Sequence, residues 1–191
     1  MKRAIHLLLV LLACTAASAH NAKQLYEEGK ALYDAKNYAA AFPKLKTAAE
    51  KGHKKAQYRL GRCYDKGRGV EENDAKAFEW YSKSAAQDYA KAIYQVGQCY
   101  KDGEGVAKDR KKAVEWFAKA AKLDNADAQL ALGKSYMKGK GVAADPAKAK
   151  TWLKKAVNNI KDGKEILQEL KKKAAEGDED AKNILAIVGK K

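Results

Sequence analysis

A serine and a lysine stand at the spacing of a known covalent-nucleophile motif. Ser135-Tyr136-Met137-Lys138 spells S-x-x-K, a pattern in which a serine attacks a carbonyl carbon with a lysine close by. Penicillin-recognising enzymes carry it together with S-D-N and K-T-G elements, and neither occurs in this sequence. We therefore expect the match to be accidental. A cell-wall-active or β-lactamase-like enzyme is kept as the alternative hypothesis.

Metal and acid–base chemistry have few candidate side chains. The chain of 191 residues contains 3 His and 3 Cys. His20 and His53 have no partners at the spacing of metal ligands or of a catalytic pair, so helix capping or solvation is the expected role. We expect no metal, no cofactor and no catalytic residue.

The first residues are typical of an export signal. Lys2 and Arg3 precede an apolar run, and small residues follow up to Ala19, which predicts cleavage after Ala19. An alternative stays open, because Leu11-Leu12-Ala13-Cys14 is similar to a lipobox and would make Cys14 the lipidated first residue of a lipoprotein. The mature protein is thus expected to be periplasmic or secreted, or else anchored to a membrane at Cys14.

The charge balance is strongly basic. Lys and Arg number 39 against 24 Asp and Glu, a formal net charge of +15, and the excess is spread along the chain. Such a balance often indicates nucleic acid binding, but an exported protein rarely meets nucleic acid. We expect a solvated basic surface, with attraction to acidic partners as the sharper hypothesis.

A period of 36 residues organises the middle of the chain. Ala56-Gln57-Tyr58-Arg59-Leu60-Gly61-Arg62-Cys63-Tyr64 aligns without gaps with the segments that begin at Ala92 and Ala128. The three tryptophans, Trp80, Trp116 and Trp152, fall on one position of the repeat. A fixed period of this length predicts a stack of repeated units.

Each unit is predicted to be a helix–turn–helix hairpin. Apolar residues of the first half recur at helical spacing, and Gly61 within that face predicts the close approach of another helix. Gly67 fits a helix C-terminal cap, and Asn73 fits the N-cap of a second helix. That second helix should bury an apolar face that includes the tryptophan. The fold class is therefore all-α, a right-handed solenoid of stacked hairpins.

The two ends depart from the repeat. Residues 20–52 are predicted to form a capping hairpin similar to a tetratricopeptide unit, with Pro43 inside its second helix, where it should kink the axis or remove a hydrogen bond. Residues 53–159 hold the three repeats. Residues 160–191 are predicted to form a helical cap, with helices near 164–176 and 179–188.

The repeated pattern resembles the Sel1-like repeat family, which is related to tetratricopeptide repeats. It reads A-x-x-x-L-G-x-x-Y-x-x-G-x-G-V and then D-x-x-K-A-x-x-W-Y/F-x-K-A-A over residues 56–159. Asn73 in place of Asp and Val96 in place of Leu are small departures. The resemblance implies an α-solenoid that scaffolds protein complexes and carries no catalytic residues.

Cys63 and Cys99 occupy the same repeat position, where the next unit has Ser135. Like positions of neighbouring hairpins are usually about 10 Å or more apart, whereas a disulfide requires Cα atoms within about 7 Å. We therefore expect two buried free thiols, although an oxidising compartment permits a disulfide.

Binding residues are sought at positions that vary while the frame stays fixed. By the resemblance, the first helix of each unit lines a concave surface, and tyrosine and arginine are typical of interface hot spots. We expect a groove that binds a protein or peptide, suited to an acidic or aromatic-bearing segment, in a protein that is a monomer. The predicted groove residues are Tyr58, Arg59, Arg62, Tyr94, Gln95, Gln98, Lys134 and Lys138.

Overall fold

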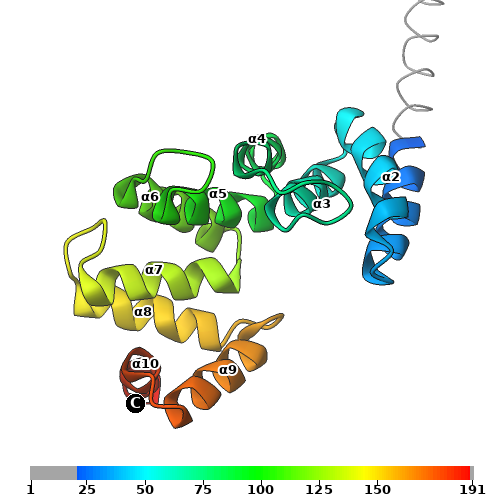
Figure 1. The fold of residues 1–191 in the computed structure, drawn as a ribbon. Coiled ribbons are helices and arrows are strands. Elements are labelled where there is room, and N and C mark those ends of the chain that lie inside the picture. The colour runs from blue at the N-terminus through cyan, green and yellow to red at the C-terminus, as the bar shows by residue number, and fades with distance from the viewer. Residues whose placement is uncertain (1–20, 190–191) are drawn as a thin grey trace, which may run out of the picture. The chain divides into compact units, whose positions relative to one another are not determined.

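Helices account for all of the regular secondary structure that the computed structural model describes, which covers residues 21–189 (Figure 1). Residues 21–34 are helical. The helices that follow are α2 (Tyr38–Glu50), α3 (Lys54–Asp65), α4 (Asp74–Ala85), α5 (Ala90–Asp102), α6 (Arg110–Lys122), α7 (Ala126–Lys138), α8 (Pro146–Val157), α9 (Gly163–Ala175) and α10 (Glu179–Gly189). The predicted all-α class of helical hairpins is confirmed.

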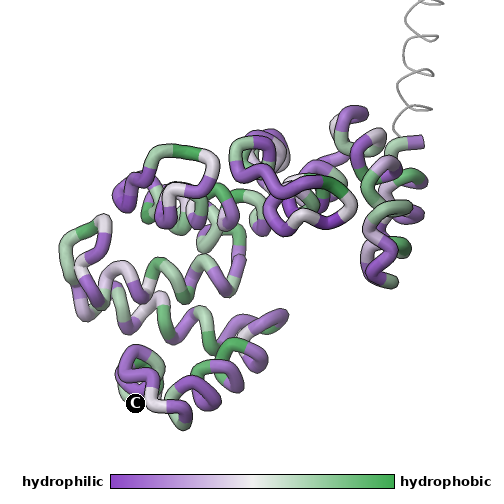
Figure 2. Tube along the Cα trace, in the orientation of Figure 1, coloured by the Kyte–Doolittle hydropathy of each residue, from purple (hydrophilic) through white to green (hydrophobic). Residues whose placement is uncertain are grey.

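The chain divides into two compact units. The N-terminal unit extends to Tyr89 and the C-terminal unit begins at Ala90. Helix α3 packs on α2 and α4 in the first, and in the second each helix from α5 to α10 packs on the next one along the chain. Hydrophobic and hydrophilic residues alternate along the helices of both units, as expected for helices that bury one side (Figure 2).

Helix starts are capped as the sequence predicts. The side chains of Asn73, Asp109 and Asp145 accept hydrogen bonds from the backbone amides three residues later, at 2.9, 3.0 and 2.9 Å. Pro146 takes the first position of α8, where its missing N–H has no intrahelical partner to lose. The repeated polar residue thus sets where the second helix of each hairpin begins.

A glycine of each first helix admits a large side chain of the second helix. A Cβ atom placed on Gly61 would lie 2.6 Å from the Tyr81 ring, and one on Gly97 would lie 2.6 Å from the Phe117 ring. Gly133 has the same relation to Leu153, at 2.7 Å. The predicted close approach is therefore found within each hairpin, and it explains why a glycine stands on a buried helical face.

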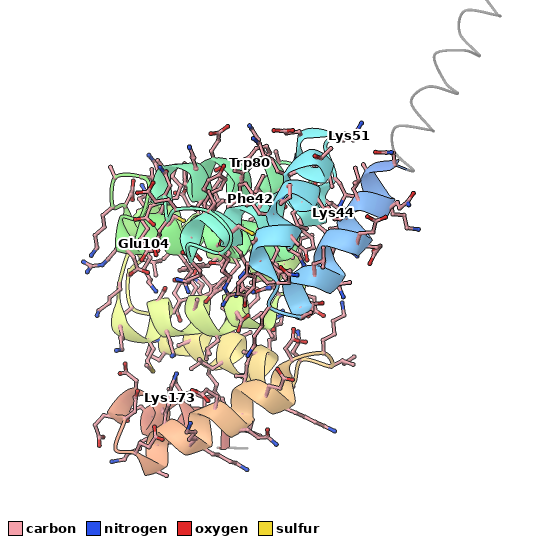
Figure 3. All side chains as sticks on the ribbon, turned by 45° about the vertical axis from the view of Figure 1, so that its right-hand side comes forward. Phe42, Lys44, Lys51, Trp80, Glu104 and Lys173 are labelled. Atoms are coloured by element: carbon pink, nitrogen blue, oxygen red, sulfur yellow. The ribbon has the colours of Figure 1, made fainter. Side chains whose placement is uncertain are left out.

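The tryptophan row is not the core of the hairpins, and the prediction that it fills the core is wrong. Trp80, labelled on α4 in Figure 3, is only partly buried, as are Trp116 and Trp152. The next residue is the buried one in each unit, with Phe117 exposing 2% of its surface. A lysine three residues on covers each indole ring, at 4.2 Å for Lys83, because that spacing places both side chains on one helical face.

The two ends are helical. Helix α2 continues through Pro43 without interruption. At the other end, α9 and α10 lie close to the predicted ranges, and both pack on α8. Leu153 of α8, Ile166 and Leu170 of α9 and Ile184 of α10 share one buried cluster. The last helices therefore cover the apolar side of the third repeat.

Candidate functional site

A cleft of about 280 Å³ lies in the C-terminal unit, between α5, α6 and α7. Each helix contributes one face. Tyr94, Gln98 and Lys101 of α5 lie at helical spacing, and Leu130, Lys134 and Lys138 of α7 lie four residues apart. The repeat therefore brings variable positions of two first helices to one cavity.

The floor of the cleft is apolar. Ala113, Val114 and Phe117 of α6 are buried, and Leu130 and Ala131 of α7 are partly buried. The Phe117 ring lies 5.7 Å from the Tyr94 ring between centroids. Because Gly97 admits Phe117 into the hairpin, the floor is held by the same contact that holds α5 against α6.

Five cations line the cleft, two of which are already paired. Lys101 lies 3.1 Å from the Asp102 carboxylate, and Lys138 makes an ion pair with Asp180 of α10. The side chains of the other three make no ion pair or hydrogen bond with any described residue. They are Arg110, Lys134 and Lys140.

Three of the cations lie at one end of the cleft. Lys101 lies in the last turn of α5, and the α5–α6 loop leads from the end of that helix to Arg110, the first residue of α6. A Cβ atom on Gly141 would lie 2.2 Å from the Arg110 carbonyl oxygen, so the α7–α8 loop packs directly on that turn and carries Lys140 with it. Gly141 has a φ of +79°, which favours glycine on its own.

Burial and neighbouring charges shift the pKa of Lys134 in the cleft. Burial, together with Lys173 and Lys138, lowers the pKa of Lys134, and Asp178 and Asp180 oppose this shift. Lys173 belongs to α9 (Figure 3). Lys134 therefore lacks a nearby carboxylate strong enough to offset its desolvation.

Asp127 lies in the first turn of α7, at the opposite end of that helix from Lys138. Desolvation, with Asp162 and Glu165, raises the pKa of Asp127, while Lys91 opposes that shift. Asp127 lines the cleft one helical turn before Leu130. The cleft therefore carries its acidic group at the end away from Arg110.

The Gln98 carboxamide leaves one buried polar atom unsatisfied. Its Nε2 donates to the Tyr94 hydroxyl, and its Oε1 is buried without a hydrogen-bond donor. A buried acceptor without a partner costs free energy, and because this oxygen has almost no accessible surface, a ligand in the cleft cannot relieve that cost.

The S-x-x-K residues line the cleft but do not form a nucleophile and base. The Ser135 hydroxyl donates to the Ala131 carbonyl oxygen at 2.9 Å, and Lys138 is paired with Asp180. No hydrogen bond joins Ser135 to Lys138. Acyl transfer would require the lysine within hydrogen-bond reach of the serine hydroxyl.

The predicted groove residues fall in two places. Tyr94, Gln98, Lys134 and Lys138 line the cleft together, whereas Gln95 does not. Arg59 of the N-terminal unit is ion-paired with Asp34 at 3.1 Å. Tyr58 packs beside Tyr81 and Tyr89, and Arg62 is partly buried on the same helix. The proposal of one groove along all first helices stays a prediction.

Sequence reasoning missed Lys101, Arg110 and Lys140. These cations stand at helix ends and in a loop, outside the first-helix positions that were considered. Their positions beside the turns could have indicated them, because Arg110 follows the N-cap Asp109 and Lys140 lies between two turn glycines. Cys14 and His20 lie outside the described residues.

Both cysteines after the predicted cleavage site are buried and free, as predicted. Burial raises the pKa of the Cys63 thiol to about 11, with nearby arginines opposing the shift. His53 caps α3, because its Nδ1 accepts from the Ala56 amide at 3.2 Å, and its ring stacks on Tyr26 at 4.5 Å. Neither side chain is set up for chemistry.

Within residues 21–189, no group of three or more His, Cys, Asp or Glu side chains could hold a metal ion. None of the helices in the same range has both the length and the apolar character needed to span a bilayer.

The fold defines a helical-repeat protein, and comparison with known proteins gives its family. The Sel1 repeat model matches residues 54–89, 90–125 and 126–159, and the chain belongs to the Sel1 repeat family. No curated protein gave a match.

Solved structures agree with this assignment. A Sel1 repeat protein from Oxalobacter formigenes is 31% identical with a TM-score of 0.69, covering 84% of this chain and 74% of its own. A protective antigen of uropathogenic Escherichia coli with an SLR fold is 34% identical with a TM-score of 0.69, covering 78% of this chain. This chain spans only 32% of that antigen. Cysteine rich protein B of Helicobacter pylori is 28% identical, with a TM-score of 0.50 and coverages of 74% and 94%.

Proposed function

We propose that this protein is an exported, non-catalytic interaction module that binds a protein or peptide segment in the cleft between α5, α6 and α7. Sel1 repeats are known as scaffolds for protein interactions, and the chain belongs to that family. The observation that carries the proposal is the cleft itself, in which three helices surround an apolar floor, with three cations that make no ion pair with a described residue. Such a combination is typical of recognition sites.

Site-specific photo-crosslinking in the native cells tests this proposal. A photoreactive residue in place of Lys101, at the cleft, should give a discrete adduct with another protein. The same residue in place of Lys122, which is exposed on α6 away from the cleft, serves as the matched control. Equal adducts at both positions, or none at Lys101, would contradict the proposal.

The alternative of a cell-wall-active or β-lactamase-like enzyme has one observation in its favour, because Ser135 and Lys138 line the same cleft. The hydrogen bonds of both side chains argue against it. We expect no hydrolysis of a chromogenic β-lactam by the purified protein. Turnover that disappears in Ser135→Ala would make the enzyme the better proposal.

The export route is tested on the mature protein. Cleavage after Ala19 leaves His20 as the first residue, and an intact mass that begins there supports a periplasmic or secreted protein. A mature chain that begins at Cys14 and carries fatty acids would instead support the lipid-anchored envelope factor. In that case Cys14→Ala should abolish the lipid label.

A further inference from the structure

The cleft has two ends of different chemistry, and its ligand must match both. Lys101, Arg110 and Lys140 gather where the α5–α6 and α7–α8 loops meet the first turn of α6. Tyr94 and Phe117 lie further along the cavity, with their rings in contact. A ligand that fills the whole cleft therefore needs an apolar part and an anionic part side by side.

The side chains of three cations in the cleft make no ion pair or hydrogen bond with a described residue. Arg110, Lys134 and Lys140 line one cavity of about 280 Å³, where Lys134 is partly buried and the other two are exposed. Like charges that line one cavity repel each other and favour an anionic ligand. The ligand side is therefore expected to carry carboxylate or phosphate groups.

The apolar floor distinguishes a peptide ligand from a phosphate ligand. Leu130 and Ala131 of α7 are partly exposed and offer an apolar surface to a side chain of the ligand, whereas a phosphate group brings nothing apolar to that surface. The chain's own net charge of +15 disfavours a second copy as the occupant.

Resting on the proposed function, we infer that the cleft takes an extended acidic peptide segment in which an apolar side chain lies next to one or more carboxylates. The apolar side chain packs on Leu130 and Ala131. The carboxylates accept hydrogen bonds from Arg110 and Lys140.

Selection from a displayed library of random short peptides tests the ligand class. The full chain is immobilised, and the enriched sequences should combine Asp or Glu with a neighbouring apolar residue. In Arg110→Glu/Lys140→Glu this enrichment should disappear. The matched control, Lys111→Glu/Lys122→Glu, makes the same change of net charge on exposed α6 residues outside the cleft and should select the wild-type set. Circular dichroism verifies that both variants remain helical.

Affinity measurements with one enriched peptide complete the test. Replacing its Asp and Glu by Asn and Gln should weaken binding about tenfold or more, and replacing its apolar residue by Ser should weaken it by a similar factor.

Three outcomes overturn the inference. They are a selection that enriches nothing, a selection without acidic bias, and a single-stranded oligonucleotide that displaces the peptide at equal charge. An adduct at Lys101 in cells combined with any of these results would remove the ligand class and leave the proposed function standing. Loss of both the adduct and the enrichment would remove both.

Discussion

The two compact units are built on the same repeat frame but use their cations differently. In the N-terminal unit, Arg59 pairs with Asp34 and its guanidinium lies 5.0 Å from the Tyr33 ring centroid, where Arg68 donates to the Tyr33 hydroxyl at 2.5 Å. In the C-terminal unit, Arg110 and Lys140 face a cavity without a carboxylate partner among the described residues.

This difference shows which cations stabilise the fold and which remain available to bind a ligand. Cations that are paired and stacked on tyrosine stabilise the packing of the helix at residues 21–34 against α3, and they have little capacity left for a ligand. Arg110 and Lys140 make no such pair with a described residue, so their charges remain available to a ligand. The repeat frame fixes the helices, and the variable positions decide which unit can bind.

The largest expected effect is the loss of stability when the buried aromatic side chain is removed, compared with removal of its half-buried neighbour. Phe117→Ala should lower the free energy of unfolding by about 3–5 kcal/mol, because it leaves a cavity beside Gly97. Trp116→Ala should cost only about 1–2 kcal/mol, because the indole is partly exposed. Urea unfolding of both variants measures the difference. Equal losses would contradict the position of the core.

A second prediction tests the glycine that admits Phe117. Gly97→Ala should cost about 1–3 kcal/mol, because its new Cβ atom would lie 2.6 Å from the ring and force the helices apart. Gly189→Ala is the matched control, since no other described element of the chain lies within 4 Å of its added Cβ. The same denaturation experiment measures both, and an unchanged midpoint for Gly97→Ala would show that α5 and α6 are not in close contact.

His53, which caps α3, should make the stability of the N-terminal unit depend on pH. Burial, with Lys55, lowers the pKa of His53 below its ordinary value of 6.5, so the unfolded chain binds its proton first as the pH falls. Stability should therefore decrease as the pH falls through about 6.5, and protonation also removes the Nδ1 acceptor of the cap. The loss should be about 1 kcal/mol.

His53→Asn keeps a capping side chain but removes the titrating group. Thermal unfolding at several pH values should give a flatter profile for this variant than for the wild type. If the stability of the wild type instead rises as the pH falls through about 6.5, the assigned role of His53 is contradicted.

The smallest expected signal is the reactivity of a thiol. Because burial raises the pKa of Cys63 to about 11, very little thiolate exists at neutral pH. A thiol reagent followed by mass spectrometry should label the folded protein slowly and the unfolded protein fully. The intact mass should also be measured without reducing agent. A value about two protons below the mass of the reduced chain would show a disulfide instead of free thiols.

Much of the fold could be predicted because its signals are local. The caps at Asn73, Asp109 and Asp145 act on backbone amides three residues later, and Gly61 acts on Tyr81 within the same hairpin. Each hairpin can therefore be predicted from its own residues. The sequence did not reveal which side of the second helix is buried, because Trp116 and Phe117 are adjacent and both are apolar. Phe117 is the buried one because it packs on Gly97 of α5, a contact between two helices that the adjacent positions do not show.

The site was less predictable because it depends on contacts between hairpins. Tyr94, Gln98, Lys134 and Lys138 could be proposed from their variable positions on first helices. Arg110 and Lys140 meet only because the Gly141 loop packs on the first turn of α6, a contact between residues 31 positions apart. Whether a cation is paired, as Arg59 is, also depends on a partner from another helix.

The most direct test of this account is the dissociation constant of one library-selected acidic peptide for three forms of the protein. Arg110→Gln/Lys140→Gln should weaken binding about tenfold or more, since it removes two unpartnered cations of the cleft. Arg59→Gln/Arg62→Gln, with its helical content verified, should bind within about twofold of the wild type. The reverse order of the two affinities would contradict the assignment of binding to the C-terminal unit.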